Sequence, residues 1–505
     1  MNQEKVNEFY ITTPIYYANA RPHLGHAYTT ILADILRNFQ RQQGKQTYFS
    51  TGTDEFGDKI VKAATKVQMT PIEFTDSISA EFSKNWELLE IYPDKFIRTT
   101  QEEHKKVVQD ILMQVYNSGD IYFDEYEGLY CVGCERFLGA DELVEGLCKD
   151  HNSAPTLIKE KNYFFKMSKY VPQILEHIEK NPDFIIPNGF KMEVISLLRD
   201  LQQNKQDLCI SRPKSRLTWG IEIPFDKNFV TYVWFDALIN YVSLLGYPNG
   251  ENFKKFWKSS HHLIAKDILR PHCIYWPAML LSCNIPLPKK IAIHGYWLMD
   301  SAKMSKSLNN QVHPLEYATK YGIDTFRYFL AKNMVFGKDS PFSHEEFLLC
   351  VNADLANNFG NLYTRVSALV EKNFNGIVHP IGEEMESSLK LKEDIQFHKK
   401  ECYSYIEEFN TAKYCEHIML ASNAINKYID DNKPWVMAKK LDEENNKIKL
   451  QSVLRVSLES ILECAKLLLP VMPKVSTQII SELGENLPEN WELPKNRARF
   501  VRFLE

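Results

Sequence analysis

The stretch FYITTPIYYANARPHLGH, residues 9–26, decides the fold class of the chain. Phe9 to Ile15 has the apolar, β-branched composition of a strand. After it, apolar residues recur on one face at helical spacing: Leu32, Ile35, Leu36 and Phe39. A second strand-like run, residues 47–50, then leads to Asp54. The order strand, helix, strand predicts an α/β protein with a doubly wound parallel sheet of the Rossmann type.

Two histidines flank a glycine where the first strand would turn into the helix: His23, Gly25 and His26. The free N–H groups and the dipole at a helix start attract phosphate. Gly25 has no side chain, so a base or ribose could approach the backbone closely. Either histidine alone is more typical of an exposed helix start, but the pair at this turn favours a nucleotide site.

A loop with two lysines, Lys303-Met304-Ser305-Lys306-Ser307, follows the strand-like run 291–295. Loops that leave the strand ends of an α/β sheet form its ligand crevice. Two ammonium groups on long stems suit a polyphosphate. Taken alone, this segment is more typical of an ordinary solvated loop. The distant histidine pair makes a joint triphosphate site the better interpretation.

Cysteine and histidine form one cluster in the middle of the chain: Cys131, Cys134, Cys148 and His151. Two pairs with two-residue spacers, 13 residues apart, match a tetrahedral zinc knuckle. A disulfide and chance clustering are the alternatives. Four ligands fill the zinc shell, so the predicted metal is structural rather than catalytic.

The composition describes an ordinary globular protein. It has 505 residues, 44% hydrophobic and 25% charged, with a net charge of −5, so nucleic-acid binding would need local basic patches. Ten cysteines in this length do not suggest a disulfide scaffold. No signal-peptide core or run of membrane-spanning length is present. A cytoplasmic protein is expected.

Changes in pattern divide the chain into four parts. Residues 1–115 and 226–345 are the two halves of the nucleotide-binding fold, the second carrying the lysine loop. Residues 116–225 depart from βα alternation and read as an insertion that holds the knuckle. Residues 346–505 are predicted to form an all-α bundle, with one apolar stripe formed by Leu454, Leu458, Ile461, Leu462, Ala465 and Leu468.

The histidine and lysine segments together resemble the signature pair of class I aminoacyl-tRNA synthetases. Over essentially the whole chain, further stretches resemble the methionyl-tRNA synthetases: TPIYYAN at 13–19, WFDA at 234–237, AKDI at 265–268, YWPAML at 275–280, NNFGNLYTR at 357–365 and NKPW at 432–435. The knuckle resembles the single-zinc form of some bacterial members. No second four-ligand cluster and no further dimerising domain is seen, so one zinc and a monomer are expected.

The resemblance implies ATP-dependent attachment of L-methionine to tRNA(Met), including the initiator, through methionyl-adenylate, with release of pyrophosphate and AMP. It implies Mg²⁺ with ATP and one structural Zn²⁺. The residues it assigns to catalysis are His23, His26, Lys303 and Lys306. Those it assigns to ATP are Gly25, Lys266, Asp267, His294, Gly295, Ser305 and Ser307.

By the same resemblance, Asp54 holds the methionine ammonium group. The residues that enclose the thioether are Pro14, Ile15, Tyr17, Trp234, Ala237, Leu238, Tyr241, Ile268 and His272. Tyr17 and His272 are the candidate polar contacts to sulfur. In the helical part, Asn361, Arg365 and Trp435 correspond to positions that read the CAU anticodon. Without the resemblance, each of these would be interpreted as core or surface.

Two other classes of function compete with this interpretation. Class I synthetases for leucine, isoleucine or valine need an editing domain, and the insertion of roughly 110 residues is too small for one. A cysteine enzyme would need a metal in its amino-acid pocket, where no thiol–histidine cluster is evident. The alternative from a different class is a non-catalytic tRNA-binding protein, and the two intact signature segments argue against it.

Overall fold

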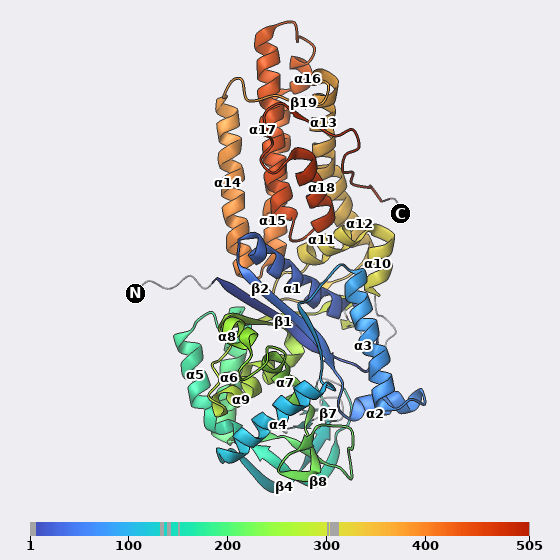
Figure 1. Cartoon of the computed structure of the whole chain (residues 1–505), viewed down its shortest axis with the longest axis vertical. Coiled ribbons are helices and arrows are strands. Elements are labelled where there is room, and N and C mark those ends of the chain that lie inside the picture. Colours follow the sequence, from blue (N-terminus) through green and yellow to red (C-terminus); the bar gives the residue numbers. More distant parts are fainter. Residues whose placement is uncertain are drawn as a thin grey trace. The chain divides into compact units, whose positions relative to one another are not determined.

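The computed structural model describes residues 7–131, 136–138, 143–149, 152–299, 302–303 and 313–503. The chain divides into two compact units (Figure 1). Unit 1 contains residues 1–21, 46–84 and 93–293, and unit 2 contains residues 22–45, 85–92 and 294–505. Within the described part of the chain, no helix has both the length and the apolar character needed to cross a membrane.

A six-stranded sheet with the strand order β3-β2-β1-β14-β15-β9 organises unit 1. Its strands are β1 (Glu8–Tyr17), β2 (Gln46–Asp54), β3 (Lys95–Arg98), β9 (Ile185–Ile186), β14 (Ser260–Ala265) and β15 (Lys290–His294). β1 pairs in parallel with β2 and β14, β2 with β3, and β15 with β9. β1 is buried along most of its length, as expected of a parallel strand covered on both faces. The predicted doubly wound sheet is confirmed.

Helices and short strands complete unit 1. They include α2 (Asp58–Lys66), α3 (Pro71–Leu88, of which residues 85–88 belong to unit 2), α4 (Glu102–Asn117), α7 (Val233–Ser243), α8 (Glu251–Phe256) and α9 (Trp276–Ser282). The chain also forms the strands β11 (Ser211–Pro213), β12 (Glu222–Ile223) and β13 (Asp226–Thr231). After β14 come a 3-10 turn (Lys266–Ile268) and a short π-helix (Pro271–Tyr275). Irregular helix of this kind is frequent at functional sites.

The segment between the two halves of this fold has a sheet of its own. β4 (Ile121–Cys131), β5 (Arg136–Leu138), β8 (Thr156–Phe165) and β10 (Leu208–Cys209) form an antiparallel sheet in the order β10-β8-β4-β5. β6 (Leu143–Val144) and β7 (Leu147–Cys148) form a small hairpin. α5 (Val171–Lys180) and α6 (Asn188–Asn204) flank β9 in sequence. Since β9 pairs with β15, this segment also returns one strand to the parallel sheet.

Unit 2 is mainly helical. It holds α1 (Leu24–Gln42), α10 (Pro314–Tyr321), α11 (Ile323–Asn333), α12 (His344–Val351), a π-helix (Asn352–Gly360), α13 (Asn361–Phe374), α14 (Glu386–Glu407), α15 (Thr411–Asn432), α16 (Pro434–Met437), α17 (Glu444–Leu468) and α18 (Pro473–Leu483). Its short strands are β16 (Trp297–Met299), β17 (Ala302–Lys303), β18 (Ser340–Pro341), β19 (Ile377–Val378) and β20 (Trp491–Glu492). Helices α14, α15 and α17 run side by side (Figure 1). All six residues of the predicted stripe on α17 are buried, so the helix bundle is confirmed.

Candidate functional site

The start of α1 holds the two signature histidines together. His23 is the N-cap residue, and its Nδ1 accepts from the Gly25 N–H at 3.1 Å. The Nδ1 atom of His26 accepts from the His23 N–H at 3.2 Å, which completes a capping box. The two rings stack with their centroids 3.7 Å apart. Since each Nδ1 accepts, the neutral rings carry their proton on Nε2 and present two N–H donors at a helix N-terminus.

Gly25 leaves space for the ring of His23. A Cβ atom at this position would lie 3.0 Å from Cε1 and 3.2 Å from Nδ1 of His23. A side chain would therefore displace the ring that caps the helix. The sequence suggested that the missing side chain makes room for a nucleotide, and the structure adds a reason within the chain itself.

His294 and Gly295, both predicted to bind ATP, pack inside unit 2. His294 is 3% exposed, its Nε2 lies 2.8 Å from the Thr29 hydroxyl, and the Tyr28 ring meets it edge-on at 5.0 Å. A Cβ at Gly295 would lie only 2.2 Å from the Lys338 carbonyl oxygen, so a close backbone approach requires glycine there. Their contact with nucleotide stays a prediction.

The lysine loop begins in a hairpin of β16 and β17, in which Leu298 pairs with Lys303. β16 also pairs in parallel with β18. Three of the predicted loop residues, Ser305, Lys306 and Ser307, lie outside the described residues. The strand expected over 291–295 is confirmed as β15.

In unit 1, the carboxyl ends of neighbouring parallel strands bring the other predicted residues to one edge of the sheet. Asp54 is the last residue of β2, is buried, and pairs in register with Tyr17 at the end of β1. β14 leads directly to Lys266 and Asp267 in the 3-10 turn, and Asp267 is exposed. A register shift in β1 between Thr12 and Ile15 marks a bulge, a feature that re-aims side chains beside active sites.

A buried tyrosine–histidine pair fixes one wall of this region. Nδ1 of His272 lies 2.8 Å from the Ile268 carbonyl oxygen, which can only accept, so Nδ1 carries the proton. Burial lowers the pKa of His272 to about 4, so the ring is neutral. Its Nε2 therefore accepts the Tyr241 hydroxyl proton across 2.7 Å.

His262, which was not predicted from the sequence, packs against Tyr241. The Trp276 indole N–H donates to its Nε2 at 3.2 Å, and its Nδ1 lies 2.9 Å from the Thr12 hydroxyl. The imidazole stacks on the Tyr241 ring at 4.1 Å. Burial pushes the pKa of His262 well below its usual value, so it supports Tyr241 as a neutral ring. The available signal was a pair of histidines, His261-His262, directly before the apolar run 263–265.

The predicted methionine-binding residues all belong to unit 1 and separate into two groups. The buried group is Pro14, Asp54, Ala237, Leu238, Tyr241 and His272. The partly exposed group is Ile15, Tyr17, Trp234 and Ile268. The Tyr17 hydroxyl donates to the Phe56 carbonyl at 2.9 Å. An apolar pocket is expected to have partly exposed aromatic and aliphatic residues that are supported by buried ones.

A second group of residues, which was not predicted from the sequence, holds the loop that follows Asp54 in place. Glu55 is fully buried, and Arg98 binds it in a fork with distances of 2.7 and 3.0 Å. The Thr53 hydroxyl donates to the same carboxylate at 2.8 Å, and the Trp219 indole N–H donates to the Glu55 carbonyl at 2.6 Å. This network fixes the backbone on the carboxyl side of Asp54.

The predicted zinc knuckle is described in part. Cys131 ends β4 and Cys148 ends β7, and both are buried in one small cluster with Leu138. Cys134 and His151 lie outside the described residues. Among the described residues alone, no group of three metal ligands occurs. Two thiols that converge from separate strand ends fit half of a tetrahedral set.

The predicted anticodon residues lie on the helical part of unit 2. Asn361 is exposed at the start of α13, and Arg365 follows one turn later. The Arg365 guanidinium donates to Asn426 Oδ1 at 2.9 Å and lies 3.6 Å from the Asp430 carboxylate, both on α15. Trp435 on α16 is 40% exposed. An indole left open to solvent offers a stacking face.

Comparison with known proteins decides the family. The family described as tRNA synthetases class I (M) matches residues 9–156 and 140–367. The methionine–tRNA ligase of Fusobacterium nucleatum is 43% identical over 94% of this chain and 74% of its own length. That of Clostridium acetobutylicum is 42% identical over 97% of this chain and 75% of its length. The chain belongs to the methionyl-tRNA synthetase family.

Solved structures of this family agree in fold. Mycobacterium tuberculosis methionyl-tRNA synthetase in complex with methionyl-adenylate is 35% identical and superposes with a TM-score of 0.93, covering 98% of this chain and all of the other. The free form of that enzyme gives a TM-score of 0.87 at 33% identity, with complete coverage of both chains. These comparisons confirm the class I synthetase fold that was predicted for this chain, including its helical carboxyl-terminal part.

Proposed function

We propose that this chain attaches L-methionine to tRNA(Met) in two steps, with ATP as the energy source and methionyl-adenylate as the intermediate. The observation that carries the proposal is the stacked pair His23 and His26, with two imidazole N–H donors at the N-terminus of α1, in a chain of this family. The family relative from M. tuberculosis was solved with methionyl-adenylate, which supports the same intermediate here.

In the first step, the methionine carboxylate attacks the α-phosphate of ATP in line. The Nε2–H groups of His23 and His26 would donate to phosphate oxygens as negative charge grows, and the dipole of α1 adds to that field. Lys303 and Lys306 would follow the departing pyrophosphate. Mg²⁺ bound with ATP neutralises part of the phosphate charge. Gly25, Lys266, Asp267, His294, Gly295, Ser305 and Ser307 complete the proposed nucleotide site.

The proposed amino-acid pocket lies in unit 1. Asp54 would pair with the methionine ammonium group, a charge-assisted bond at a buried carboxylate. Ring faces and aliphatic groups would enclose the polarizable thioether. The protons of Tyr17, Tyr241 and His272 that could reach sulfur are engaged within the protein. The thioether is therefore proposed to be recognised by fit and dispersion.

In the second step, a ribose hydroxyl of the terminal tRNA adenosine attacks the adenylate carbonyl and releases AMP. The helical part would hold the anticodon: Trp435 stacks on an unstacked base, and Asn361 and Arg365 bond base edges. The contacts from Arg365 to Asn426 and Asp430 on α15 orient the guanidinium for that role. Residues 346–505 are thus proposed as the anticodon-binding domain.

We also propose one structural zinc, held by Cys131, Cys134, Cys148 and His151. The convergence of the Cys131 and Cys148 thiols in one buried cluster supports it, and thiolate and imidazole donors suit zinc. Bound there, the metal would supply folding free energy to residues 116–225, which we propose as the connective insertion of the catalytic domain.

Methionine-dependent ATP–pyrophosphate exchange tests the proposed function. The purified chain would be assayed with methionine, leucine, isoleucine, valine and cysteine in separate reactions. Methionine should support exchange far better than the others. A preference for one of the other four would overturn the methionine assignment, and no exchange with any of them would favour a tRNA-binding protein without catalysis.

Replacing Lys306 with alanine should slow adenylate formation at least tenfold, which corresponds to about 1.4 kcal/mol of transition-state stabilisation. The reason is the loss of a cation beside the departing pyrophosphate. Pyrophosphate exchange at saturating methionine and ATP measures it. Wild-type rates in Lys306→Ala would remove this lysine from the proposed catalytic set.

Replacing Trp435 with alanine should weaken aminoacylation of tRNA(Met) by about tenfold while pyrophosphate exchange stays at the wild-type rate. Base stacking on an aromatic ring is worth about 1–3 kcal/mol, and exchange does not involve tRNA. Trp435 is half open to solvent, so the substitution should leave the fold intact. Equal losses in both assays would point to general unfolding instead of anticodon binding.

A further inference from the structure

A buried arginine in unit 2 joins three helical segments that lie far apart in sequence. Arg327 on α11 has no exposed surface. Its Nη2 donates to Asp34 Oδ2 on α1 at 2.7 Å and to the Pro470 carbonyl at 3.1 Å. Its Nε donates to the Val471 carbonyl at 2.9 Å. Pro470 and Val471 belong to the turn between α17 and α18, so one guanidinium binds this turn and α1 together.

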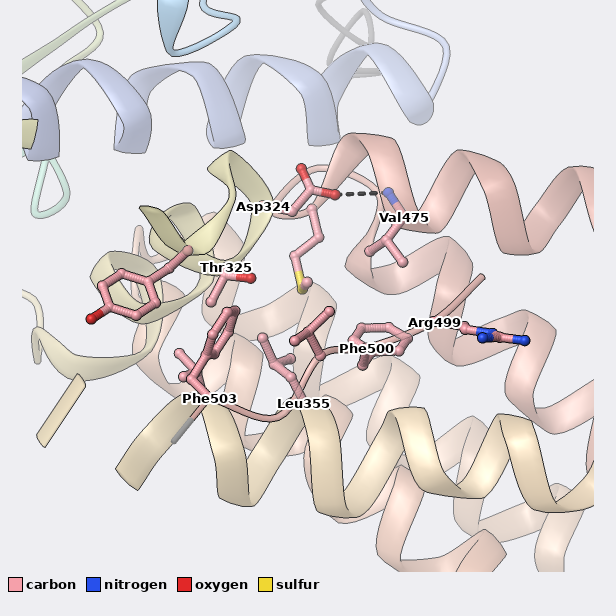
Figure 2. Close-up of a pocket in the computed structure, with 11 residues that line it drawn as sticks. Asp324, Thr325, Leu355, Val475, Arg499, Phe500 and Phe503 are labelled. Atoms are coloured by element: carbon pink, nitrogen blue, oxygen red, sulfur yellow. Dashed lines mark hydrogen bonds between the residues drawn. The ribbon is translucent and has the colours of Figure 1, made fainter. Parts of the chain in front are cut away.

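One turn earlier on α11, Asp324 binds the same turn from its other side. Its Oδ2 accepts the backbone N–H of Val475, in the first turn of α18, at 2.7 Å (Figure 2). Arg327 thus meets carbonyls after the end of α17, while Asp324 meets an N–H at the start of α18. Both charges oppose the partial charge of the helix end that they contact. We call Asp324 and Arg327 the α11 clamp.

The clamp lies between the two functional ends of unit 2. On one side, Asp34 is part of α1, the helix whose first turn carries His23 and His26. On the other side, α17 leads away from the clamp for 25 residues, about 37 Å, and packs against α16, which holds Trp435. Figure 1 shows α16 and α11 at opposite ends of this helical part.

The side chains around Asp34 also link α1 to Tyr92, which lies outside the clamp. Its Oδ1 accepts from Arg37 Nη2 at 2.5 Å, and Arg37 Nη1 donates to the Tyr92 carbonyl at 2.7 Å. A network of this kind, once desolvated, has only a few arrangements that leave no charge unpaired. It therefore holds α1 in a defined position relative to the α17–α18 turn.

A partly open cavity lies beside the clamp. It has a volume of about 200 Å³ and is bordered by Met472 of the turn, Val475 of α18, Leu355 of the π-helix and Phe500 of the carboxyl-terminal segment (Figure 2). The cavity is partly open to solvent and lies against the segment that the clamp holds, so this side of the turn is not closely packed.

We propose that the α11 clamp makes methionyl transfer depend on the anticodon: engagement of the correct anticodon at Trp435 shifts α17 and its turn, and Arg327 passes the shift to α1, whose first turn lies in the proposed nucleotide site. Asp324 and Arg327 are positioning residues in this scheme and touch no substrate. The inference rests on the proposed function, since it needs both the histidine site and the anticodon site. A purely structural clamp would instead affect all activities alike.

The test is single-turnover transfer of methionine from preformed adenylate to saturating tRNA, with the CAU anticodon and with one altered base. The readout is the ratio of the two transfer rates, which the proposal requires to exceed one in the wild type. Arg327→Lys keeps the charge but loses the fork that reaches three oxygens. Its ratio should fall close to one, while methionine-dependent pyrophosphate exchange stays within about twofold of wild type, a change worth only about 0.4 kcal/mol.

Two further variants keep the outcome interpretable. Asp324→Asn retains an oxygen for the Val475 N–H but removes the charge, and its ratio should fall less than that of Arg327→Lys. If Arg327→Lys fails to fold, Asp324→Asn decides the question. The control is Gln42→Ala, which removes a surface bond between α1 and the Lys466 carbonyl of α17 at 2.9 Å; its ratio should match the wild type.

An unchanged ratio in folded clamp variants, a wild-type ratio of one, or parallel loss of transfer and exchange together with a lower Tm would each overturn the proposal. Failure of the wild type to support methionine-dependent exchange would count against the proposed function itself. The two failures are therefore separate.

Discussion

Replacing His26 with alanine should lower methionine-dependent pyrophosphate exchange about a hundredfold, or about 2.7 kcal/mol, the scale observed when one oxyanion donor is removed. The substitution removes an imidazole N–H from the N-terminus of α1 and also removes the acceptor for the His23 N–H. The effect should appear in kcat rather than in the KM for methionine, because the donor acts on charge that develops in the transition state. Steady-state exchange at varied methionine and ATP measures both constants.

The loss of the helix cap has to be separated from the loss of the donor. His26→Gln supplies this control, because a glutamine at the third helical position can accept from the N-cap N–H, as in a capping box. It should keep the Tm of the wild type, whereas His26→Ala should lower it. If His26→Gln is as stable and as active as the wild type, the imidazole is a cap and not a catalytic group.

Replacing Asp54 with asparagine should raise the KM for methionine about a hundredfold, or about 2.7 kcal/mol, within the range for a charged partner left unpaired in a buried site. Asp54 is buried at the end of β2, and the network of Glu55 and Arg98 holds the chain beside it. The side chain size is unchanged, so the pocket shape persists and kcat should change less than KM. Exchange kinetics against methionine concentration give the answer.

Asp76→Asn is the matched control for Asp54. Asp76 is also an acidic residue of unit 1, but it is more than half exposed and pairs with Arg98. A surface ion pair contributes little to stability, so the KM for methionine should stay near the wild-type value. Equal KM changes in Asp54→Asn and Asp76→Asn would show a general field effect instead of direct pairing with the ammonium group.

The features that the sequence predicted correctly are local ones. The periodicity of residues 9–54 predicted β1, α1 and β2 because strand and helix spacing is read within one segment. The stripe on α17 predicted a buried helix for the same reason. The paired signature segments then indicated the family, which the comparisons confirmed.

The features that the sequence did not predict depend on partners that are distant along the chain. Glu55 and Arg98 are separated by 43 residues, and Asp34 and Arg327 by 293. Nothing in the local pattern distinguishes these charges from solvated surface residues. His262 was overlooked because a histidine in a buried strand has no chemical role until its neighbours, Trp276 and Thr12, are known.

Glycine is the residue type for which the structure changed the interpretation most. Gly295 was predicted from the family resemblance to contact ATP. The structure gives a reason internal to the chain, because the Lys338 carbonyl occupies the space of a side chain. A missing Cβ shows that something approaches closely, but only coordinates identify whether that is a ligand or the protein itself.

The fixed proton arrangement of Tyr241, His272 and Ile268 has a consequence for amino-acid selection. Because the hydroxyl and ring protons of this pocket wall already form hydrogen bonds within the protein, the wall can distinguish amino-acid side chains only by their length, width and polarizability. Norleucine, which swaps sulfur for a methylene, should then compete measurably with methionine, since such a difference is worth only about 1–3 kcal/mol in an apolar pocket. Methionine sulfoxide, whose added oxygen would find no donor, should be rejected far more strongly.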